Sequence, residues 1–398
     1  MKKTIALILS LALCFSSFFL YSFASDNEDN SIVDTNNGAE IEDVDVEGLT
    51  VKAKSAVLMD AESGVILYSK NASEALPPAS VTKIMTLLLI AEAIDTGRIK
   101  PEDTVTVSAN ATSMGGSQVF LSEGEQFTVE ELLKCTVIAS ANDAALALAE
   151  HLAGTEEHFV ALMNERAAVL GMKNTCFENA TGLDDTVEKH LTSAYDIALM
   201  SRELIKHELI LKYSNVWQDE IRNGEFILTN TNRLVRYYSG CTGLKTGSTD
   251  KAGFCISATA KRDGMHLIAV IMGSETRDER NNAARALLDY GFAGYGIYKD
   301  DPSPLNRVEV KKGSLDAVTP YSSGVSILMS KGDIHKIEKQ YYLPECIVGQ
   351  HSSGTKIGEI RYLLNGEIVG RSDIIVTEDI EGLTLFDIFL RILIGALT

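Results

Sequence analysis

Residues 77–86 read Pro77-Pro78-Ala79-Ser80-Val81-Thr82-Lys83-Ile84-Met85-Thr86, and this stretch decides the fold. Two prolines precede a mostly apolar run that continues to Ile94. We expect a helix to open near Ser80, because proline suits the first turn of a helix but not its interior. Ser80 and Lys83 then share one helix face. A neutral lysine amine beside a hydroxyl can take its proton during attack on a carbonyl, which predicts a serine nucleophile with a lysine base.

The Ser-x-x-Lys pattern is weak by itself, since Ser248 to Lys251 and Ser353 to Lys356 fit it as well. Only Ser80 stands behind two prolines and before an apolar helix. A base of this kind needs a lowered lysine pKa, which burial and a second nearby cation supply. The positive end of the helix also favours the anion that develops there.

Two more polar motifs follow in order, Ser140-Ala141-Asn142 and Lys245-Thr246-Gly247. The first interrupts an apolar helical region. We expect Ser140 to relay a proton toward the leaving amine, and Asn142 to hydrogen-bond the substrate and Lys83. The alternative is that Asn142 and Asp143 only cap the next helix.

The third motif precedes a strand hairpin. We expect Lys245 to hold a carboxylate and, through its charge, to lower the pKa of Lys83. Gly247 would let a substrate backbone approach closely. Thr246 and Ser248 would donate hydroxyl hydrogen bonds to the carboxylate, and the backbone N–H groups of Ser80 and Ser248 would form an oxyanion hole. The alternative is an edge strand with solvated polar residues.

Hydrophobic periodicity predicts an α+β fold, in which strands distant in sequence form one sheet and enclose a helical insertion. A small all-β module is expected to follow. The expected elements are a hairpin over 56–68, a helix pair over 129–152 broken at 140–142, a helix over 192–211, strands over 254–260 and 267–272, a helix over 281–292, and short strands over 308–310, 325–329, 357–364 and 373–376. The predicted domains are a signal peptide (1–24), an acidic flexible tether (25–48), a catalytic domain (49–297) with a helical insertion (97–214), a β-rich domain (298–380) and an amphipathic helix (381–398).

The two ends of the chain predict export and contact with a membrane. Two lysines precede an apolar run over 5–20, and Ser22-Phe23-Ala24 fits a cleavage site after Ala24. A retained membrane anchor is the alternative. Residues 25–47 are acidic and poor in large apolar side chains, which predicts a flexible tether. Residues 383–397 are too few for a comfortable membrane span and fit a helix lying in the membrane interface; a helix packed on the protein's own core is the alternative.

Composition excludes several other functions. The formal net charge of the 398 residues is -19, which argues against nucleic acid as a partner. The five cysteines beyond residue 24 are scattered and form no CxxC pair, so neither a zinc site nor a disulfide scaffold is expected, although a Cys241–Cys255 pair stays open. No Gly-x-Ser-x-Gly elbow or His-Glu-x-x-His helix occurs. We expect no metal and no cofactor, and we expect His190 and His266 to be structural.

The three motifs together resemble those of the low-molecular-mass penicillin-binding proteins that are D-alanyl-D-alanine carboxypeptidases. The resemblance extends to Asn179-Ala180-Thr181-Gly182-Leu183 and to Lys251-Ala252-Gly253-Phe254. It implies a penicillin-binding or β-lactamase-like catalytic domain, an antiparallel sheet flanked by helices with a helical subdomain, and then a small all-β domain. It also implies a place on the outer face of the cytoplasmic membrane or in the cell wall.

The resemblance further implies the reaction. Ser80 would be acylated by the penultimate D-alanine of a peptidoglycan stem pentapeptide, the terminal D-alanine would leave, and water would release the tetrapeptide. β-Lactam antibiotics would be covalent inhibitors. The family also places an arginine near the substrate carboxylate; Arg280 is the choice by spacing, Arg277 the second choice, and Arg233 a weaker candidate for shaping the site.

Two departures from the family pattern limit what carries over. Ser248 stands where some relatives have histidine, so substrate preference and deacylation rate stay open. The Ser-Ala-Asn motif agrees better with this family than with class A β-lactamases, and no Glu-x-x-Leu-Asn segment offers a deacylation base. Two alternatives remain: a β-lactamase, against which the β-rich domain and apolar tail argue, and a non-catalytic module that binds the wall or senses penicillin.

Overall fold

The structure is a computed structural model that describes residues 41–44, 46–185, 187–384, 386, 387 and 389. The predicted signal peptide, most of the predicted tether and most of the predicted C-terminal helix lie outside these residues. The predicted domain boundaries stay predictions.

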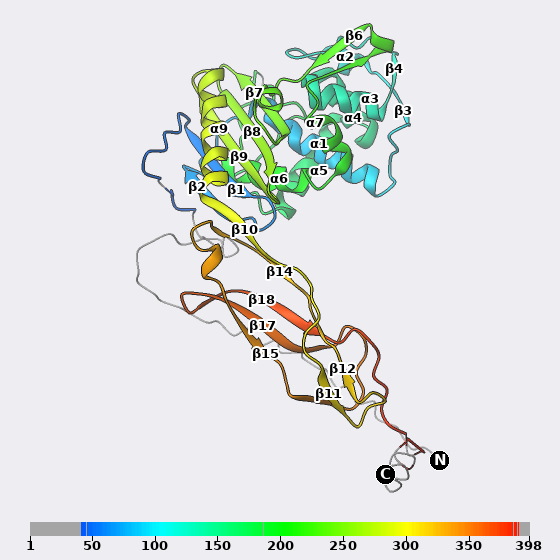
Figure 1. Cartoon of the computed structure of the whole chain (residues 1–398). Helices are drawn as coiled ribbons and strands as arrows, with labels where there is room; N and C mark the ends of the chain where they lie inside the picture. The colour runs from blue at the N-terminus through cyan, green and yellow to red at the C-terminus, as the bar shows by residue number, and fades with distance from the viewer. Residues whose placement is uncertain (1–40, 45, 186, 385, 388, 390–398) are drawn as a thin grey trace, which may run out of the picture. The chain divides into compact units, whose positions relative to one another are not determined.

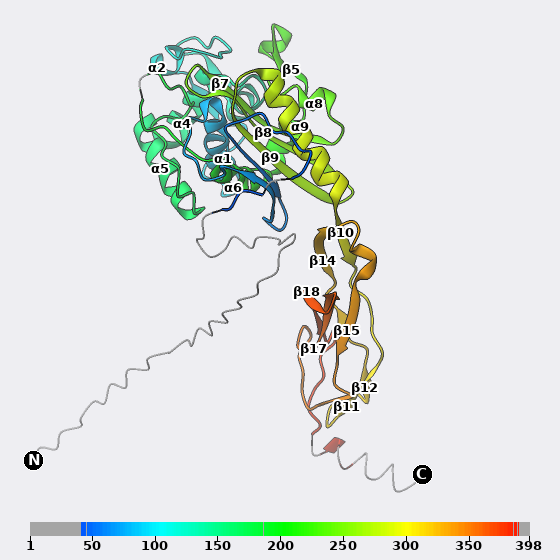
Figure 2. The ribbon, with the colours of Figure 1, turned by 90° about the vertical axis from the view of Figure 1, so that its left-hand side faces the viewer.

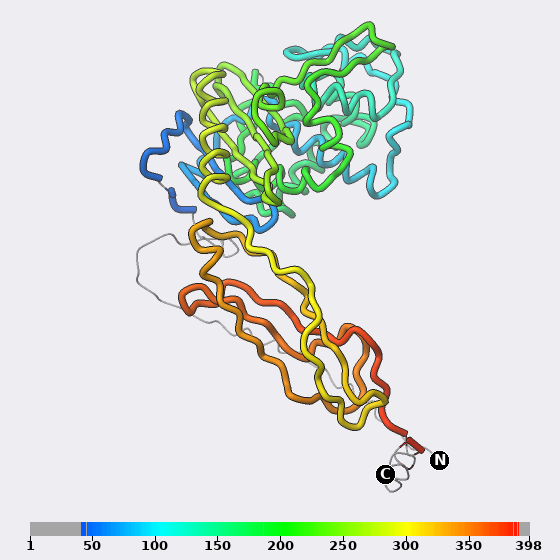
Figure 3. Tube along the Cα trace, viewed as in Figure 1, coloured from blue at the N-terminus to red at the C-terminus, as the bar shows by residue number. Residues whose placement is uncertain are grey.

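A five-stranded antiparallel sheet in the order β2-β1-β9-β8-β7 forms the centre of the N-terminal part (Figure 1). Strands β1 and β9 pair although they are about 200 residues apart, with Val57 opposite Val270. The chain trace in Figure 3 shows the blue N-terminal strands beside the yellow-green ones. The predicted hairpin and the two predicted later strands are confirmed. The strands are β1 (Ser55–Asp60), β2 (Ile66–Lys70), β7 (Cys241–Thr249), β8 (Gly253–Arg262) and β9 (Met265–Ser274).

Helices cover both faces of this sheet, which explains why its strands read as continuous apolar runs. Leu58 and Ala269 point to the side of α9 (Arg277–Gly294), whereas Val57 and Val270 point to the side of α1 (Lys83–Asp95) and α6 (Ala194–Leu204). Successive residues of a strand alternate between faces, so each strand contributes to two separate cores. Figure 2 shows α9 on one side of strands β8 and β9, and α1 and α6 on the other side.

The helical region differs from the prediction between α6 and α7, and it also contains the short strands β3 and β4. A single helix was expected over 192–211, but α6 ends at Leu204 and α7 starts at Glu208, with His207 contacting Asp95 in between. The predicted helix pair is confirmed, and a π-helical turn over Cys135–Ala139 leads into its break. The other elements here are α2 (Ala109–Thr112), α3 (Val129–Lys134), α4 (Asn142–Ala153), α5 (Glu156–Val169), α7 (Glu208–Ser214), α8 (Leu234–Tyr237), β3 (Thr104–Thr106), β4 (Gln126–Thr128), β5 (Gln218–Ile221) and β6 (Phe226–Thr229).

The described end of the predicted tether is docked rather than free. Val44 N–H donates to the carbonyl of Ser69 on β2, and Ser69 Oγ donates to the Glu42 carbonyl. Asp43 accepts a hydrogen bond from Asn71 N–H. The prediction that residues 41–44 are flexible is therefore wrong, because these backbone groups find partners along the edge of the sheet.

The C-terminal part is all β, as predicted, and has two small apolar cores. A four-stranded sheet in the order β13-β18-β17-β15 is its largest sheet. Helix α9 runs directly into β10, which pairs with β14. The strands are β10 (Tyr295–Asp300), β11 (Val308–Lys311), β12 (Ala317–Val318), β13 (Tyr321–Ser322), β14 (Val325–Ser330), β15 (Glu338–Tyr342), β16 (Cys346–Val348), β17 (Lys356–Leu364) and β18 (Glu367–Ile375).

The cysteines are free thiols within the described part of the chain, Cys241 and Cys255 included. Among the same residues, no group of three His, Cys, Asp or Glu side chains is arranged to hold a metal ion. None of the helices in the described residues is both long enough and apolar enough to cross a bilayer.

Strand β7 packs directly on the turn that carries Ser80. The helix predicted near Ser80 begins there as a 3-10 turn over Ala79–Thr82, and α1 follows from Lys83. A Cβ added to Gly247 would lie 2.7 Å from Ser80 N and 2.9 Å from both Pro78 O and Val81 N. These are backbone atoms that cannot rotate away. Gly247 therefore serves this contact, and the approach of a substrate backbone to Gly247, which lines the pocket over Ser80, stays a prediction.

Replacing Gly247 should destabilise the protein. In Gly247→Ala the new methyl group overpacks the contact, and we expect the free energy of unfolding to fall by about 1–3 kcal/mol in urea denaturation followed by circular dichroism. Gly294→Ala is the matched control, since nothing lies within 4 Å of its added Cβ, and it should lose no stability, because alanine suits a helix better than glycine does. Equal stability of the two variants would contradict the tight contact.

Candidate active site

Lys83 lies at the centre of the site, with its side chain fully buried. Its Nζ is 2.9 Å from Ser80 Oγ, and it also contacts Asn142 Oδ1 and, at 2.9 Å, the Thr181 carbonyl oxygen. The last two groups can only accept hydrogen bonds, whereas a hydroxyl can also donate. When protonated, the amine can donate to all three oxygens. When it is neutral, its two N–H groups can stay on Asn142 and Thr181, and its lone pair then faces the hydroxyl of Ser80.

The surroundings favour this neutral amine. Burial lowers the pKa of Lys83 well below its ordinary value, and the charge of Lys245 lowers it further. The negative charge of Asp143 opposes them more weakly. The sequence analysis expected these two causes, burial and a second cation.

The turn over 179–183 holds the Thr181 carbonyl against Lys83. Asn179 Oδ1 accepts hydrogen bonds from the N–H groups of Thr181 and Gly182, at 3.1 and 2.7 Å. Thr86 on α1 donates to the Ala180 carbonyl at 2.6 Å. The contact of the Thr181 carbonyl with Lys83 could not be predicted from the sequence, because a backbone carbonyl belongs to every residue type.

Ser140 adopts an unusual backbone conformation. Its φ of 62° and ψ of 28° lie in the left-handed region, immediately after the π-helical turn. Asn142 follows as the first residue of α4, and its Nδ2 donates to the Gly115 carbonyl at 2.6 Å. The Asn142 side chain thus joins Lys83 to the 115–117 loop. The alternative that Asn142 caps the helix is wrong, since the N-cap is Ala141 and no side chain caps it.

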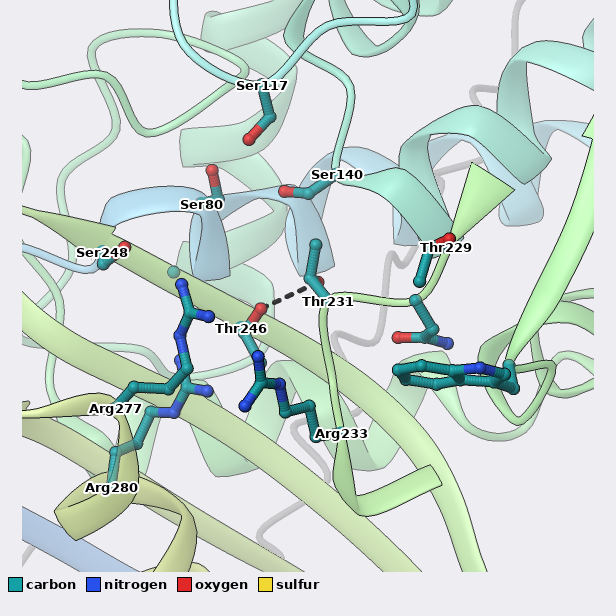
Figure 4. A pocket seen from close by; sticks show the side chains of 13 residues that line it. Ser80, Ser117, Ser140, Thr229, Thr231, Arg233, Thr246, Ser248, Arg277 and Arg280 are labelled. Carbon is teal, nitrogen blue, oxygen red and sulfur yellow. Dashed lines mark hydrogen bonds between the residues drawn. The ribbon is translucent and has the colours of Figure 1, made fainter. Parts of the chain in front are cut away.

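Strand β7 supplies Lys245, Thr246 and Ser248. Lys245 is buried, donates to the Thr246 carbonyl at 3.1 Å, and has its pKa lowered to about 7 by burial and by the charge of Arg280. Thr246 Oγ1 donates to Thr231 Oγ1 at 2.8 Å (Figure 4). Ser248 is exposed at the pocket.

A pocket of about 420 Å³ opens over Ser80. Figure 4 shows the side chains of Ser80, Ser117 and Ser140 gathered on one side, and three arginines on another. Among the described residues that line the pocket there is no carboxylate, although the whole chain is strongly acidic. The lining residues are Ser80, Ser117, Ser140, Trp217, Thr229, Asn230, Thr231, Arg233, Thr246, Gly247, Ser248, Arg277 and Arg280.

All three arginines considered from the sequence, Arg233, Arg277 and Arg280, therefore reach the pocket. Arg280 is the most enclosed of them: it is 3 % exposed, and burial lowers its pKa to about 10. Its guanidinium donates to Asn281 Oδ1 at 2.9 and 3.1 Å. The site can therefore hold an anion beside a nucleophilic hydroxyl.

Sequence reasoning missed the wall formed by Ser117, Trp217 and Thr229. The one available signal was Gly115-Gly116 before Ser117. A Cβ on Gly116 would lie 2.8 Å from Asn142 Nδ2, so this glycine permits a close approach to the second motif.

Comparison with known proteins agrees with this geometry. Residues 42–276 match the family described as D-alanyl-D-alanine carboxypeptidase, and residues 295–382 match the C-terminal domain of penicillin-binding protein 5. The curated D-alanyl-D-alanine carboxypeptidase DacF of Bacillus subtilis is 44% identical over 341 residues, which cover 84% of this chain and 87% of DacF.

Solved structures are similar as well. Penicillin-binding protein 5 of Haemophilus influenzae is 30% identical with a TM-score of 0.71, and the match covers 85% of this chain and all of that one. Penicillin-binding protein D2 of Listeria monocytogenes, solved in its ampicillin-bound form, is 31% identical with a TM-score of 0.57 over 61% of this chain and 98% of its own. The chain belongs to the D-alanyl-D-alanine carboxypeptidase family of penicillin-binding proteins.

Proposed function

We propose that this chain removes the terminal D-alanine of peptidoglycan stem pentapeptides through an acyl-enzyme on Ser80. The serine-type D-alanyl-D-alanine carboxypeptidase activity itself follows from the family. The observation that carries the assignment to Ser80 is the contact of its Oγ with the Lys83 amine, whose other two partners are acceptors.

The proposed acylation moves one proton and exchanges one bond. Ser80 Oγ attacks the carbonyl carbon of the penultimate D-alanine while its proton passes to Lys83 Nζ. The backbone N–H groups of Ser80 and Ser248 hold the oxyanion. The peptide C–N bond then breaks, and the leaving amine of the terminal D-alanine takes up a proton through Ser140. Water later hydrolyses the ester.

The terminal carboxylate is assigned to the cationic side of the pocket. Lys245 and Arg280 are buried cations. Arg280 lines the pocket together with Arg233 and Arg277, and Thr246 and Ser248 offer hydroxyl groups there. A carboxylate here would gain charge-assisted hydrogen bonds, which are stronger than those between neutral groups. The same site accounts for β-lactams as covalent inhibitors, since they present a reactive carbonyl and a carboxylate.

A D-alanine release assay tests the assignment. The wild-type protein should free D-alanine from a peptide ending in Lys-D-Ala-D-Ala and should form a long-lived adduct with labelled penicillin. In Ser80→Ala the rate of D-alanine release should fall more than about 10³-fold, and labelling by penicillin should be lost. Its melting temperature should be unchanged. The peptide amide should react far more slowly, because it lacks the carboxylate.

Two results would count against the proposal. No release by the wild-type protein at any pH from mildly acidic to mildly alkaline would favour the non-catalytic alternative. Rapid turnover of the labelled penicillin, in place of a stable adduct, would favour the β-lactamase alternative.

The pH dependence of kcat/KM should be bell-shaped. The rate rises with pH as Lys83 loses its proton and becomes a base. It falls again as Lys245, whose pKa is lowered to about 7, loses the charge that holds the carboxylate. In Lys245→Arg the guanidinium keeps its charge, so the alkaline limb should move upward while the acid limb remains. An alkaline limb at the same pH in both proteins would exclude Lys245 as its origin.

We also propose that the protein is exported and lies at the outer face of the cytoplasmic membrane or in the cell wall, held to the membrane surface by its C-terminal helix. Thr384 and Asp387 exchange hydrogen bonds in the pattern of a helix start. Phe386 and Phe389, three residues apart, are 68% and 60% exposed, which favours a lipid surface over packing on the protein's own core.

Truncation tests the anchor. The full chain should sediment with vesicles that contain anionic lipid, whereas a chain ending at Gly382 should stay in the supernatant with unchanged D-alanine release. Sedimentation of the truncated chain would show that another part of the protein binds the membrane.

A further inference from the structure

We propose that His190 is a positioning residue for acylation, which fixes the Ser80 turn through Thr82 and ties it to the turn that holds Lys83. The inference rests on the proposed roles of Ser80 and Lys83. His190 does not line the pocket and is 3% exposed, with its ring packed near Phe177. Its effect on the reaction is therefore indirect.

Two independent contacts require the same tautomer of His190. The Nδ1 atom faces the Glu178 N–H at 3.0 Å, and only an unprotonated nitrogen can accept that hydrogen bond. The Nε2 atom lies 2.8 Å from Thr82 Oγ1. The Thr82 hydroxyl already donates its single proton to the Ala79 carbonyl at 2.8 Å, so it must accept from His190 Nε2–H.

The chain of hydrogen bonds ends on a strained residue. Ala79, directly before Ser80, has a φ of 49°, in the left-handed region that a non-glycine residue rarely occupies. Its carbonyl is held by Thr82 and by close packing, since a Cβ on Gly182 would lie 1.8 Å from Ala79 O. Such strain persists when surrounding contacts over-determine the conformation.

His190 therefore joins the two parts that must meet for catalysis. Through Glu178 it holds the start of the segment that runs to the Thr181 carbonyl, a partner of Lys83. Through Thr82 it holds the turn that sets the direction of Ser80. Burial lowers the pKa of His190 to about 4, against the charges of Glu178 and Asp184, so the ring stays neutral and keeps this tautomer at the pH of the reaction.

The chain provides a matched control. His266 is partly buried, and its Nε2 also lies near a threonine hydroxyl, Thr242 Oγ1, at 2.9 Å. Its pKa is likewise lowered to about 4 by burial. Thr242 hydrogen-bonds to Thr259 on the sheet and accepts from Ser214, and neither bond involves Ser80 or Lys83. Replacing His266 therefore removes a comparable histidine–threonine pair without touching the Ser80 turn.

The experiment compares His190→Phe, His190→Gln and His266→Phe in the full chain. It measures the rate of acylation by labelled penicillin, together with kcat and KM for D-alanine release and the melting temperature. We expect His190→Phe to slow acylation about 10–100-fold with little change in KM, because a small misplacement of a nucleophile costs about that much. Glutamine keeps an acceptor and a donor and should restore most of the rate. His266→Phe should acylate normally.

Thr82→Val covers the case in which His190→Phe does not fold. It removes only the hydroxyl between His190 and Ala79, and it should slow acylation similarly. The double variant Thr82→Val, His190→Gln should acylate as fast as Thr82→Val alone, since the two substitutions act through one hydrogen-bond chain. The proposal would be overturned if folded His190→Phe or Thr82→Val acylated normally. It would also be overturned if His266→Phe were slowed as much as His190→Phe, or if His190→Gln were as slow as His190→Phe. Labelling of Ser80→Ala would instead indicate that the proposed nucleophile is wrong.

Discussion

The burial of the Lys83 amine is the constraint on which the site depends. A buried amine without partners is costly, and here its partners come from three separate segments: the Ser80 turn, the start of α4 and the 179–183 turn. Contacts to the backbone fix these segments in turn. In the 179–183 turn, for example, the N–H groups of Thr181 and Gly182 donate to Asn179 Oδ1. Moving any one segment would leave a polar atom unsatisfied away from water.

Lys83 and Lys245 are both buried, and each has a lowered pKa. Two such amines resist carrying a proton at the same time, so the pair favours one charged and one neutral member. The arginines near Lys245 mark its end of the site as the place for an anion, and the acceptors around Lys83 suit a neutral base. The two lysines have the same side-chain chemistry, so their different roles, a base at Lys83 and an anion-binding cation at Lys245, follow from their neighbours.

The sequence was informative where side chains carry the signal. The three motifs and the apolar runs of the sheet strands predicted the α+β fold, the hairpins and the residues that meet around Ser80. The sequence was uninformative about contacts made by backbone atoms. The contact of the Thr181 carbonyl with Lys83 and the fit of Gly247 against Ser80 N correspond to no motif in a single sequence. The break between α6 and α7 and the docking of residues 41–44 depend on partners far along the chain, such as Asp95 and Ser69.

Trp217 is the one tryptophan of the chain, and it lies in the wall of the pocket with the Arg236 guanidinium 5.4 Å from its ring. The long-wavelength ultraviolet emission of the whole protein therefore originates at the edge of the cavity over Ser80. The indole shares one pocket with Ser80 and has a cation over its ring, so its emission is expected to change when a ligand enters the pocket.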